Sequence, residues 1–567
     1  MNFMGEYQKW LDNPTIDNDT KVELQAIASD SKEIQDRFYK QLEFGTGGMR
    51  GVLGAGTNRL NIYTIRKATQ GLANYILASD AYQPGMGVAI AHDCRRMSPE
   101  FSTEAALVLN ANGIKTYTFD SLRPTPLLSF AVRHLGCIAG IVVTASHNPP
   151  EYNGYKVYWS DGGQCPYPRD EAIIREVQKV DFGMAKIMPQ TDAEKAGLFN
   201  IAPPSVDDEF MKHVKARCLN AEIIPDSDIK IVFTPLHGAG NVLVQRALRE
   251  VGFKHVYVVK EQEQPDGNFP TVNYPNPEDV KAFTCAISLA KEIDADIVVA
   301  TDPDCDRVGA AVKHNGEYIL FNGNMTGVIL TDYLVSQMRE RGKLPANGVI
   351  ISTIVSTNMT RAIAEANGLS YMEVLTGFKY IGEKIKQFED TGSHSYIFGF
   401  EESFGYLAGT YARDKDAVGA TLLICEAAAY YRKQGLSLYD ALQKLYEKYG
   451  TYHESIESIT LKGAEGVENI KKIMANLRQD PPTELAGGKV VEVRDYLSGI
   501  TTKGALSKQT DLPTSDVLYY AMEDDSWACV RPSGTEPKIK IYFGAGSKGK
   551  LAELTTDMCS RIDAILL

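Results

Sequence analysis

The sequence predicts an α/β protein with three consecutive α/β units and a different, α+β unit at its C-terminal end. Three observations support this fold class. Short apolar runs with the length of buried strands alternate with segments of helical periodicity through most of the chain. Strand, loop and helix follow one another in each of the first three units, whereas the last unit mixes strands and helices differently. The length of 567 residues fits four domains at about 150 residues each.

The first unit is predicted over residues 1–207, with extra helices packed on its N-terminal side. Residues 6–42 alternate apolar and charged side chains at helical spacing, which predicts these helices. A polar, proline-containing stretch at 201–208 indicates the first domain boundary. The other elements expected in this unit are strands at 86–91, 114–119 and 140–143 and a helix at 103–112.

The remaining units are predicted over residues 208–322, 323–452 and 453–567. The second follows the polar stretch at 201–208, the third begins with a helical segment, and the last follows the helix expected at 438–449. The elements expected here are strands at 230–233, 295–300 and 318–321, then a helix at 324–339, strands at 349–352 and 395–400 and a helix at 438–449, and a final helix at 551–567. No sequence repeat is detectable between the units.

Composition and charge exclude several classes of protein. The chain has 44% hydrophobic and 23% charged residues, as ordinary globular proteins do, and a net charge of -13 argues against nucleic acid or an anionic membrane as partner. The nine cysteines are scattered without a C-x-x-C pair, which favours reduced thiols. Neither a signal peptide nor an apolar run of about 18 residues is found, so we expect a cytoplasmic protein.

The first candidate site follows the apolar run 140–143, where a buried parallel strand would end. Open α/β sheets bind ligands at such ends, and Ser146 stands there. A turn predicted at Asn153-Gly154 returns Lys156 toward it, with His147 alongside. These residues suggest a nucleophile or phosphate carrier, because a serine nucleophile needs a neighbour that takes its proton or stabilises its charge. The alternative interpretation is a polar turn that caps a helix.

The second candidate follows the strand-like run 295–300. Asp302, Asp304 and Asp306 alternate, so in an extended segment their carboxylates project to one side. Three like charges so close require a cation, and hard oxygen ligands favour Mg²⁺ over Mn²⁺ or Ca²⁺. The adjacent Arg307 suits a phosphoryl group. An EF-hand is excluded because its glycine and glutamate positions hold Arg307 and Lys313; an acidic, solvated turn stays the alternative.

Two further loops carry polar side chains suited to a phosphorylated sugar. Glu401 and Ser403 follow the run 395–400 and share a face by the two-residue rule, so they can bind a pair of hydroxyls. The segment 531–538 (Arg-Pro-Ser-Gly-Thr-Glu-Pro-Lys) combines a guanidinium, two hydroxyls and a glycine, which is phosphate-binding chemistry without a metal. A hairpin turn is the alternative for that segment.

These four loops, in this order, resemble those of the α-D-phosphohexomutase family. Smaller signatures of that family occur in residues 44–51 (Phe-Gly-Thr-Gly-Gly-Met-Arg-Gly), 376–379 and 413–416. The resemblance runs from about Phe44 to the C-terminus, and it implies mixed sheets and four domains around a central active-site cleft. Residues 45–59 (Gly-Thr-Gly-Gly-Met-Arg-Gly-Val-Leu-Gly-Ala-Gly-Thr-Asn-Arg) are similar to the branch that holds bacterial α-phosphoglucomutases and vertebrate phosphopentomutases.

The resemblance implies an isomerase that interconverts glucose 1-phosphate and glucose 6-phosphate. Ser146 would carry the phosphate, and glucose 1,6-bisphosphate would be both intermediate and activator. Glu401-Glu402 resembles the sugar loop of glucose-preferring members. Position 305 is cysteine where the family usually has alanine, which places a thiol beside the metal without removing a ligand.

The resemblance also implies a role for each site residue. Mg²⁺ would be held by the Ser146 phosphate and the three aspartates. Lys415 is the expected proton-transfer group, with His147 as the second candidate, and a lysine base requires a lowered pKa. The remaining assignments are catalytic assistance by Arg50, Lys156 and Arg307, sugar binding by Gly377, Phe378, Lys379, Glu401 and Ser403, and distal phosphate binding by Arg531, Ser533, Gly534 and Thr535.

Alternative functions remain at this level. The same mechanism could serve a phosphomannomutase or a phosphopentomutase, and a metal-dependent phosphatase or an inactive scaffold could keep parts of the site. We expect a small-molecule phosphosugar as substrate, neither nucleic acid nor a membrane as partner, and a monomer or small homo-oligomer. The fourth domain is the expected moving part, because it must accept both orientations of the intermediate. A P-loop-like segment at 544–551, His237 and the turn 265–270 are read as structural.

Overall fold

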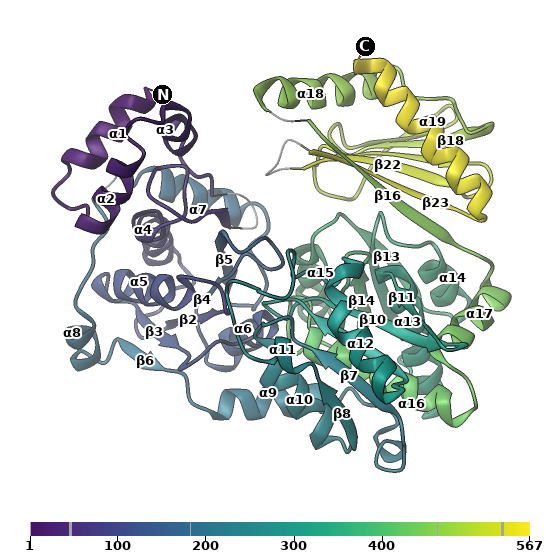
Figure 1. The fold of residues 1–567 in the computed structure, drawn as a ribbon. Coiled ribbons are helices and arrows are strands. Elements are labelled where there is room, and N and C mark those ends of the chain that lie inside the picture. The colour runs from purple at the N-terminus through teal and green to yellow at the C-terminus, as the bar shows by residue number, and fades with distance from the viewer. Residues whose placement is uncertain (1, 45–47, 182, 462, 534–537, 567) are drawn as a thin grey trace.

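The computed structural model of the chain describes residues 2–44, 48–181, 183–461, 463–533 and 538–566. Four sheets follow one another along these residues, and we call the parts built on them domains 1 to 4 (Figure 1). The first three sheets mix parallel and antiparallel strands and are accompanied by helices, whereas the fourth is antiparallel. The predicted fold class is confirmed. The boundaries at 207, 322 and 452 stay predictions, and helix α9 (Ser205–Lys215) runs through the first of them.

Domain 1 consists of three N-terminal helices beside a six-stranded sheet in the order β1-β5-β4-β2-β3-β6. The helices α1 (Phe3–Asp12), α2 (Asn18–Ala26) and α3 (Ser31–Phe38) share a small core around Trp10. The other elements are β1 (Met49–Val52), α4 (Ile62–Ala78), β2 (Gly87–His92), α5 (Ser98–Ala111), β3 (Lys115–Thr118), α6 (Thr125–His134), β4 (Ala139–Val143), β5 (Tyr152–Trp159), α7 (Arg169–Gln178), α8 (Gln190–Lys195) and β6 (Phe199–Ile201).

Two expectations about domain 1 are corrected. The helix expected to begin at residue 103 begins at Ser98, because Pro99 fits the first helical turn, whose N–H groups need no partner within the helix. The turn expected at Asn153-Gly154 is wrong, since both residues belong to β5, which pairs with β1 and β4. The chain reverses earlier, over residues 146–151. Gly154 is required there because a Cβ would lie 2.4 Å from the Thr144 carbonyl oxygen.

Domain 2 has the strand order β11-β10-β9-β7-β8, and domain 3 has the order β13-β12-β14-β15. Domain 2 continues from α9 with η1 (Ala221–Ile223), β7 (Lys230–Thr234), α10 (Gly240–Glu250), β8 (His255–Val258), α11 (Lys260–Glu263), η2 (Val280–Phe283), α12 (Thr284–Ile293), β9 (Ile297–Thr301), β10 (Val308–His314) and β11 (Glu317–Phe321). Domain 3 contains α13 (Gly323–Glu340), β12 (Gly348–Thr353), α14 (Met359–Ala366), β13 (Ser370–Val374), α15 (Phe378–Thr391), β14 (Ser395–Glu401), β15 (Gly405–Ala408), α16 (Ala417–Lys433) and α17 (Leu438–Tyr449).

Domain 4 is an antiparallel sheet with two long helices. Its strands follow the order β16-β23-β22-β21-β18-β19-β20, and β17 pairs with β18. Its elements are β16 (His453–Thr460), α18 (Gly463–Gln479), β17 (Glu484–Leu485), β18 (Gly488–Asp495), β19 (Ile500–Lys503), β20 (Leu506–Gln509), β21 (Leu518–Met522), β22 (Trp527–Pro532), β23 (Lys538–Ala545) and α19 (Lys548–Leu566).

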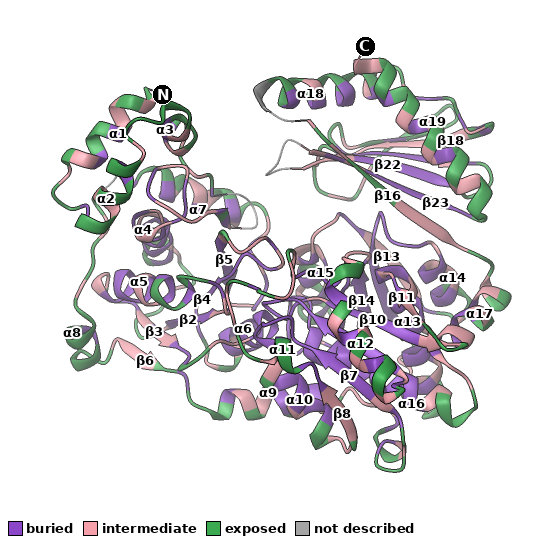
Figure 2. Ribbon diagram, viewed as in Figure 1, coloured by how far each residue is buried: buried purple, intermediate pink, exposed green. Residues whose placement is uncertain are grey.

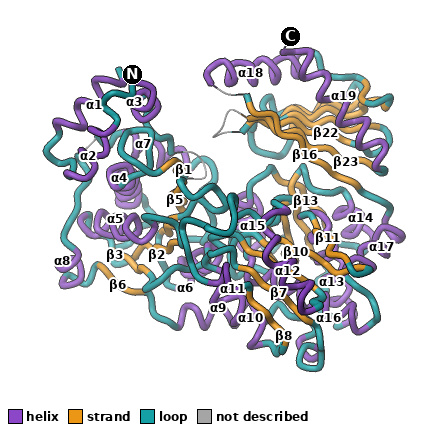
Figure 3. Tube along the Cα trace, in the orientation of Figure 1, coloured by secondary structure: helices purple, strands orange, loops and turns teal. Residues whose placement is uncertain are grey.

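Domains 1 to 3 place their candidate loops at equivalent positions. In each domain a strand with a parallel partner ends, a short loop follows, and the chain returns as an antiparallel strand: β4 to β5, β9 to β10, and β14 to β15. Figure 3 shows loops gathered where domain 1 meets domains 2 and 3. The three loops can therefore converge, although Asp302 lies 156 residues and Ser403 lies 257 residues beyond Ser146 in the chain.

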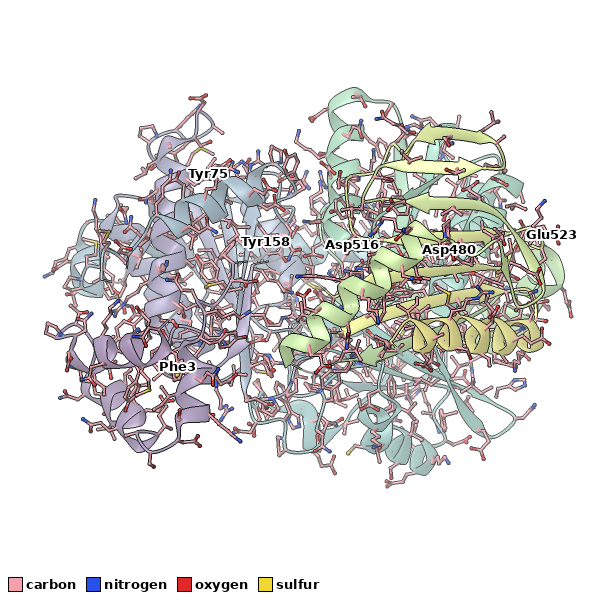
Figure 4. The ribbon with its side chains drawn as sticks, turned by 90° about the horizontal axis from the view of Figure 1, so that it is seen from above. Phe3, Tyr75, Tyr158, Asp480, Asp516 and Glu523 are labelled. Carbon is pink, nitrogen blue, oxygen red and sulfur yellow. The ribbon has the colours of Figure 1, made fainter. Side chains whose placement is uncertain are left out.

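The buried apolar residues form one core that domains 1 to 3 share and a separate core in domain 4 (Figure 2). Seen from above, the labelled Phe3 and Tyr75 lie on the side of domain 1, and Asp480 and Glu523 lie on the side of domain 4 (Figure 4).

Within the described ranges, no helix has the length and apolarity needed to cross a membrane.

Candidate active site

Ser146 lies in a tight turn directly after β4. Its backbone has a φ of 51°, a left-handed conformation that is strained for a residue other than glycine. The Ser146 N–H donates a 2.8 Å hydrogen bond to Thr144 Oγ1, and only 3% of the residue is exposed. Because β5 follows this turn and not a helix, the helix-cap alternative is wrong.

The three aspartates of domain 2 converge as predicted. Their carboxylate oxygens lie within 4.8 Å of one another, and Asp302, Asp304 and Asp306 are at most 2% exposed. The solvated-turn alternative is therefore wrong. The extended geometry is also wrong: residues 302–307 form a turn in which Cys305 has a φ of 55°. Cys305 is not part of the acidic cluster, and its buried thiol faces Gly240, where a Cβ would lie 2.8 Å from Sγ.

The acidic cluster has the properties of a metal site. Asp304 Oδ1 and Asp306 Oδ1 are buried and have no hydrogen-bond partner among the described residues, a costly arrangement that an added cation would relieve. Burial, together with Asp304 and Asp306, raises the pKa of Asp302 well above its ordinary value. All ligand atoms on offer are hard oxygens, which suit a divalent cation such as Mg²⁺. The residues present therefore fit a metal ion.

Ser146 and the acidic cluster meet across the boundary between domains 1 and 2. Ser146 Oγ donates a 2.7 Å hydrogen bond to Asp302 Oδ2 and lies 3.1 Å from His147 Nδ1. On the domain 1 side, Thr125 Oγ1 also donates to Asp304 Oδ2 at 2.9 Å. The serine hydroxyl and the candidate metal ligands thus form one buried polar centre.

Two lysines neutralise part of this negative charge. Lys156 Nζ lies 2.8 Å from Asp304 Oδ2, and Lys415 Nζ lies 3.2 Å from Asp306 Oδ2 and 2.8 Å from Asp414 Oδ1. Burial alone would raise the pKa of Asp306, but Lys415, Lys156 and Arg307 outweigh it and lower that pKa. Both ammonium groups are therefore held beside the carboxylates that would bind a metal.

The expectation of a lowered Lys415 pKa is wrong. Burial favours neutral lysine, but the carboxylates of Asp306, Asp414 and Glu401 outweigh burial and raise the Lys415 pKa. His147 behaves in the opposite way, because burial and the nearby Arg307 and Arg50 lower its pKa well below the ordinary value. Lys415 is thus positively charged and His147 neutral at pH 7 in this arrangement.

Two arginines flank the centre from different domains. Arg50 on the edge strand β1 donates to Asn148 Oδ1 at 2.9 Å, within the serine loop. Arg307 donates to Glu278 Oε1 at 2.6 Å, and its Nε lies 3.8 Å from Asp306 Oδ1. Burial would lower the pKa of Arg307, but the carboxylates of Glu278 and Asp306 outweigh it and raise the pKa. One guanidinium at the serine loop and one at the acidic cluster suit a phosphoryl group.

Four of the five predicted sugar-binding residues, Gly377 to Lys379 and Glu401, adjoin in domain 3. The extended geometry predicted for Glu401 and Ser403 is wrong, because β14 ends at Glu401 and residues 402–404 form a turn. The Gly377 N–H donates a 2.8 Å hydrogen bond to Glu401 Oε1, so the segment 377–379 and the sugar loop adjoin. Lys415 Nζ lies 5.5 Å from the centre of the Phe378 ring. Lys379 Nζ lies 3.4 Å from Asp170 Oδ2 of domain 1. Glu402 and Ser403 line a cavity of about 270 Å³ that Lys540 and Tyr542 of domain 4 close from the other side.

The distal phosphate loop lies at the end of β22. Arg531 and Ser533 are partly exposed, and Arg531 stands opposite Lys540 in the pairing of β22 with β23. Gly534 and Thr535 lie outside the described residues, as do Gly45, Thr46 and Gly47 of the N-terminal signature. Their predicted roles stay predictions.

Comparison with known protein families gives four consecutive matches. They are the phosphoglucomutase/phosphomannomutase alpha/beta/alpha domain I over residues 41–184, domain II over 208–316, domain III over 322–449 and the C-terminal domain over 464–560. The chain belongs to the phosphoglucomutase/phosphomannomutase family. The family predicted from the sequence is thereby confirmed.

Similar proteins agree with this membership. A phosphoglucomutase of Staphylococcus aureus is 39% identical over 516 residues, which are 90% of each chain. Two solved structures share the fold of this family member. A phosphoglucomutase/phosphomannomutase family protein of Burkholderia thailandensis has a TM-score of 0.66 at 20% identity, covering 93% of this chain and 98% of the other. The Paramecium phosphoglucomutase parafusin has a TM-score of 0.68 at 17% identity, covering 93% and 95%.

Several residues of this family member's site are not evident from sequence. Asp414, Glu278 and Asp170 each hold a cation of the site, namely Lys415, Arg307 and Lys379. Asp414 belongs to the segment 413–416 that the sequence singles out, so its position was a usable signal. Glu278 and Asp170 lie in segments without any motif, and only the fold brings them near the cations.

Proposed function

We propose that the enzyme is an isomerase that interconverts α-D-glucose 1-phosphate and glucose 6-phosphate through a phosphorylated Ser146. The observation that carries the proposal is the 2.7 Å hydrogen bond from Ser146 Oγ to Asp302 Oδ2, which joins a buried nucleophile to a buried acidic cluster. A phosphoryl group on Ser146 Oγ would pass to the free hydroxyl of the bound sugar phosphate and give glucose 1,6-bisphosphate. The bisphosphate turns over and returns its other phosphoryl group to Ser146.

The cofactor proposed for the acidic cluster is Mg²⁺. Asp302, Asp304 and Asp306 would hold it together with an oxygen of phosphorylated Ser146. When bound, the ion offsets the negative charge of the phosphoryl group. Lys156 and Arg307 are positioned to stabilise the same charge from the protein side, since both already contact the carboxylates of the cluster. Arg50 would contact the phosphoryl group from β1.

The sugar is proposed to bind between domains 1 and 3. Glu401 and Ser403 would hold two neighbouring hydroxyls, and Gly377 fixes the Glu401 carboxylate through its N–H. Phe378 and Lys379 follow in the same segment and would line the site. The proton of the accepting hydroxyl needs an acceptor, for which Lys415 and His147 stay the candidates. The arrangement favours His147 on charge, because a neutral imidazole can take a proton and a charged ammonium cannot.

Glucose is the proposed sugar because of the residue pair Glu401-Glu402 and because the Staphylococcus aureus relative is named a phosphoglucomutase. Mannose differs from glucose only at the second carbon, so residues that bind the third and fourth hydroxyls would not separate the two sugars. We expect kcat/KM to rank glucose 1-phosphate first, mannose 1-phosphate second and ribose 1-phosphate last. A preference for ribose 1-phosphate would make the enzyme a phosphopentomutase with the same chemistry.

The decisive experiment measures two products in one sample. The enzyme is supplied with glucose 1-phosphate, Mg²⁺ and a trace of glucose 1,6-bisphosphate, and glucose 6-phosphate and inorganic phosphate are both quantified. A mutase yields glucose 6-phosphate with almost no inorganic phosphate. If inorganic phosphate is released in an amount equal to the sugar phosphate consumed, the protein is a phosphatase. If neither product forms, it is an inactive homologue.

We place the enzyme in the cytoplasm, in keeping with its nine unpaired cysteines.

A further inference from the structure

Arg95, which follows β2, holds the serine loop from inside the protein. Its side chain is completely buried, and its guanidinium donates to the carbonyl oxygens of Ser146 at 2.6 Å, Pro149 at 2.9 Å and Tyr152 at 3.0 Å. It also donates to the carbonyl of Asn148. These four carbonyls span the whole turn between β4 and β5. Only the planar, five-donor fork of arginine can serve so many acceptors from one position.

Asp93 completes the support on the other side of the loop. Its carboxylate accepts hydrogen bonds from the Arg95 N–H at 2.9 Å, from Ser98 Oγ at 2.9 Å and from Thr144 Oγ1 at 2.6 Å. Thr144 Oγ1 in turn accepts from the Ser146 N–H. Backbone on both sides of the Ser146 hydroxyl is thereby fixed, which can maintain the strained φ of this residue.

A segment of domain 2 presses against this support. The Phe269 ring lies 5.0 Å from the Arg95 guanidinium carbon, and Phe269 is buried with a left-handed φ of 48°. Gly267 packs so tightly on the backbone that a Cβ would lie 2.6 Å from Arg96 N and 2.8 Å from Cys94 O. The turn at 265–270, which the sequence indicates only as a turn, is therefore an interdomain contact.

The same segment is connected to the loop of the three aspartates. His237 Nε2 lies 2.9 Å from Thr271 Oγ1, and His237 Nδ1 lies 3.2 Å from the Gln264 carbonyl oxygen. Two residues further along, the Ala239 N–H donates to the Pro303 carbonyl oxygen at 2.8 Å, between Asp302 and Asp304. Residues 264–271 thus contact Arg95 on one side and, through the His237 segment, the metal loop on the other.

We infer that Arg95 is a positioning residue which, fixed from domain 2 by Phe269, sets the place of Ser146 Oγ relative to Asp302. The inference rests on the proposed phosphoserine function. The Arg95 guanidinium donates to backbone carbonyls of the serine loop and lies against Asp93 and Phe269, none of which is a predicted sugar-binding residue. Loss of its fork would misplace the nucleophile, and a displacement of about 1 Å can cost about 100-fold in rate.

The test compares Arg95→Lys with Arg96→Lys. Lysine keeps the charge beside Asp93 but cannot reach all four carbonyls. Arg96 is the matched control, because it is exposed and donates to only one loop carbonyl, that of Pro150 at 3.0 Å. For Arg95→Lys we expect kcat to fall about 30- to 100-fold while the KM for glucose 1-phosphate changes less than about threefold. Arg96→Lys should stay within about twofold of wild type in both.

A second readout separates positioning from stability. The rate at which Ser146 takes up phosphate from glucose 1,6-bisphosphate, followed by intact mass, should fall in parallel with kcat for Arg95→Lys. Phe269→Leu, which keeps apolar bulk but removes the ring over Arg95, should slow both rates about three- to tenfold with unchanged KM. A folded Arg95→Lys protein with wild-type kcat would overturn the inference.

If Arg95→Lys does not fold, Phe269→Leu decides alone: slowed phosphate uptake supports the inference, and wild-type uptake overturns it. The proposed mutase function and the proposed role of Arg95 are refuted by different results. A wild-type protein that releases phosphate instead of isomerising sugar refutes the mutase function, whereas the ratio of variant to wild-type uptake still tests the role of Arg95.

Discussion

The serine and metal loops differ from the distal phosphate loop in how firmly the protein holds them. Ser146 and the three aspartates are almost fully buried, and they belong to domains joined by one continuous core. Arg531 and Ser533 are partly exposed and belong to domain 4, which has a separate core. Domain 4 contacts domain 3 through a small apolar cluster that includes Val355 and Trp527 and through the ion pair of Arg494 with Glu373.

This difference suggests that domains 1 to 3 form a fixed part of the enzyme and that domain 4 is a movable part. Phosphoryl transfer requires a nucleophile and charge-stabilising groups in fixed positions. The proposed distal phosphate loop would instead have to accept the intermediate in two orientations, and a domain with few apolar contacts to the rest can move at low cost. Substitutions in the fixed part should therefore reduce kcat, and those in domain 4 should raise KM.

The largest effect is expected for Ser146→Ala. Removal of the phosphate carrier should lower turnover by about 10⁴-fold or more, because residual catalysis can come only from binding. The fold should persist, since one small side chain is lost. The control is Ser102→Ala, another buried serine of domain 1, whose hydroxyl has no hydrogen-bond partner among the described residues. Wild-type turnover in Ser146→Ala would refute the assignment of the carrier.

The next largest effect is expected for Asp304→Asn and for removal of metal. An amide cannot supply the carboxylate charge that binds the cation, so kcat should fall about 100-fold or more. EDTA should abolish wild-type activity and Mg²⁺ should restore it. Cys305→Ser, one position along the same turn, should keep most activity because the thiol faces away from the acidic cluster. Full activity in chelator would contradict the metal site.

Arg531→Met should produce the opposite kinetic pattern. Loss of a charged hydrogen bond to the distal phosphate, of about 1.5–3 kcal/mol, should raise the KM for glucose 1-phosphate about 10- to 100-fold. The kcat should fall less than for Asp304→Asn, since the reacting groups keep their places. Steady-state kinetics of the two variants side by side test the comparison. A pure loss of kcat in Arg531→Met would mean that domain 4 takes part in the chemical step.

The smallest effect on activity is expected for Glu426→Gln, far from the site. Glu426 on α16 is fully buried, accepts from the Asn220 N–H, and burial raises its pKa to about 7. A carboxyl group whose pKa is higher in the folded than in the unfolded protein stabilises the fold, and this stabilisation is complete at pH values below the unfolded pKa of 4.5. It is lost as the pH rises through the folded pKa of about 7. Wild type should therefore lose about 2–3 kcal/mol relative to Glu426→Gln between pH 4.5 and 8.

Urea unfolding of both proteins at pH 5 and pH 8 measures this difference. Glu447→Gln, at an exposed position of α17, is the matched control and should show no change of stability with pH relative to wild type. A difference between wild type and Glu426→Gln that is the same at both pH values would contradict the raised pKa.

Much of the fold and of the candidate site could be predicted from the sequence, because the information was local. Buried strands such as β9 read as apolar runs, and the polar residues that follow them stand out. What failed depended on pairing or on partners far along the chain. Gly154 looks like a turn residue until its close contact with the Thr144 carbonyl is known. Burial lowers the Lys415 pKa, and the carboxylates of Asp306, Asp414 and Glu401 outweigh it; of these three, only Asp414 is a neighbour in sequence.

Arg95 shows the same limit of sequence-based prediction for a residue that the sequence does not single out. It stands in a segment without a recognised motif, and its four acceptors are backbone carbonyls, which have no sequence signature. The residues most visible in the sequence are those proposed to contact substrate or metal. Of the residues that hold them in place, Asp414 lies in a segment that the sequence singles out, whereas Arg95, Glu278 and Asp170 emerge only from the fold.

The most direct test of the account follows one labelled phosphoryl group. The enzyme is loaded at Ser146 with radioactive phosphate, freed of small molecules, and mixed with unlabelled glucose 1-phosphate and Mg²⁺ for a single turnover. We predict that the label leaves Ser146 and appears in glucose 1,6-bisphosphate or glucose 6-phosphate, with almost none as inorganic phosphate. Label that stays on the protein while glucose 6-phosphate forms, or that is released as inorganic phosphate, would contradict the account.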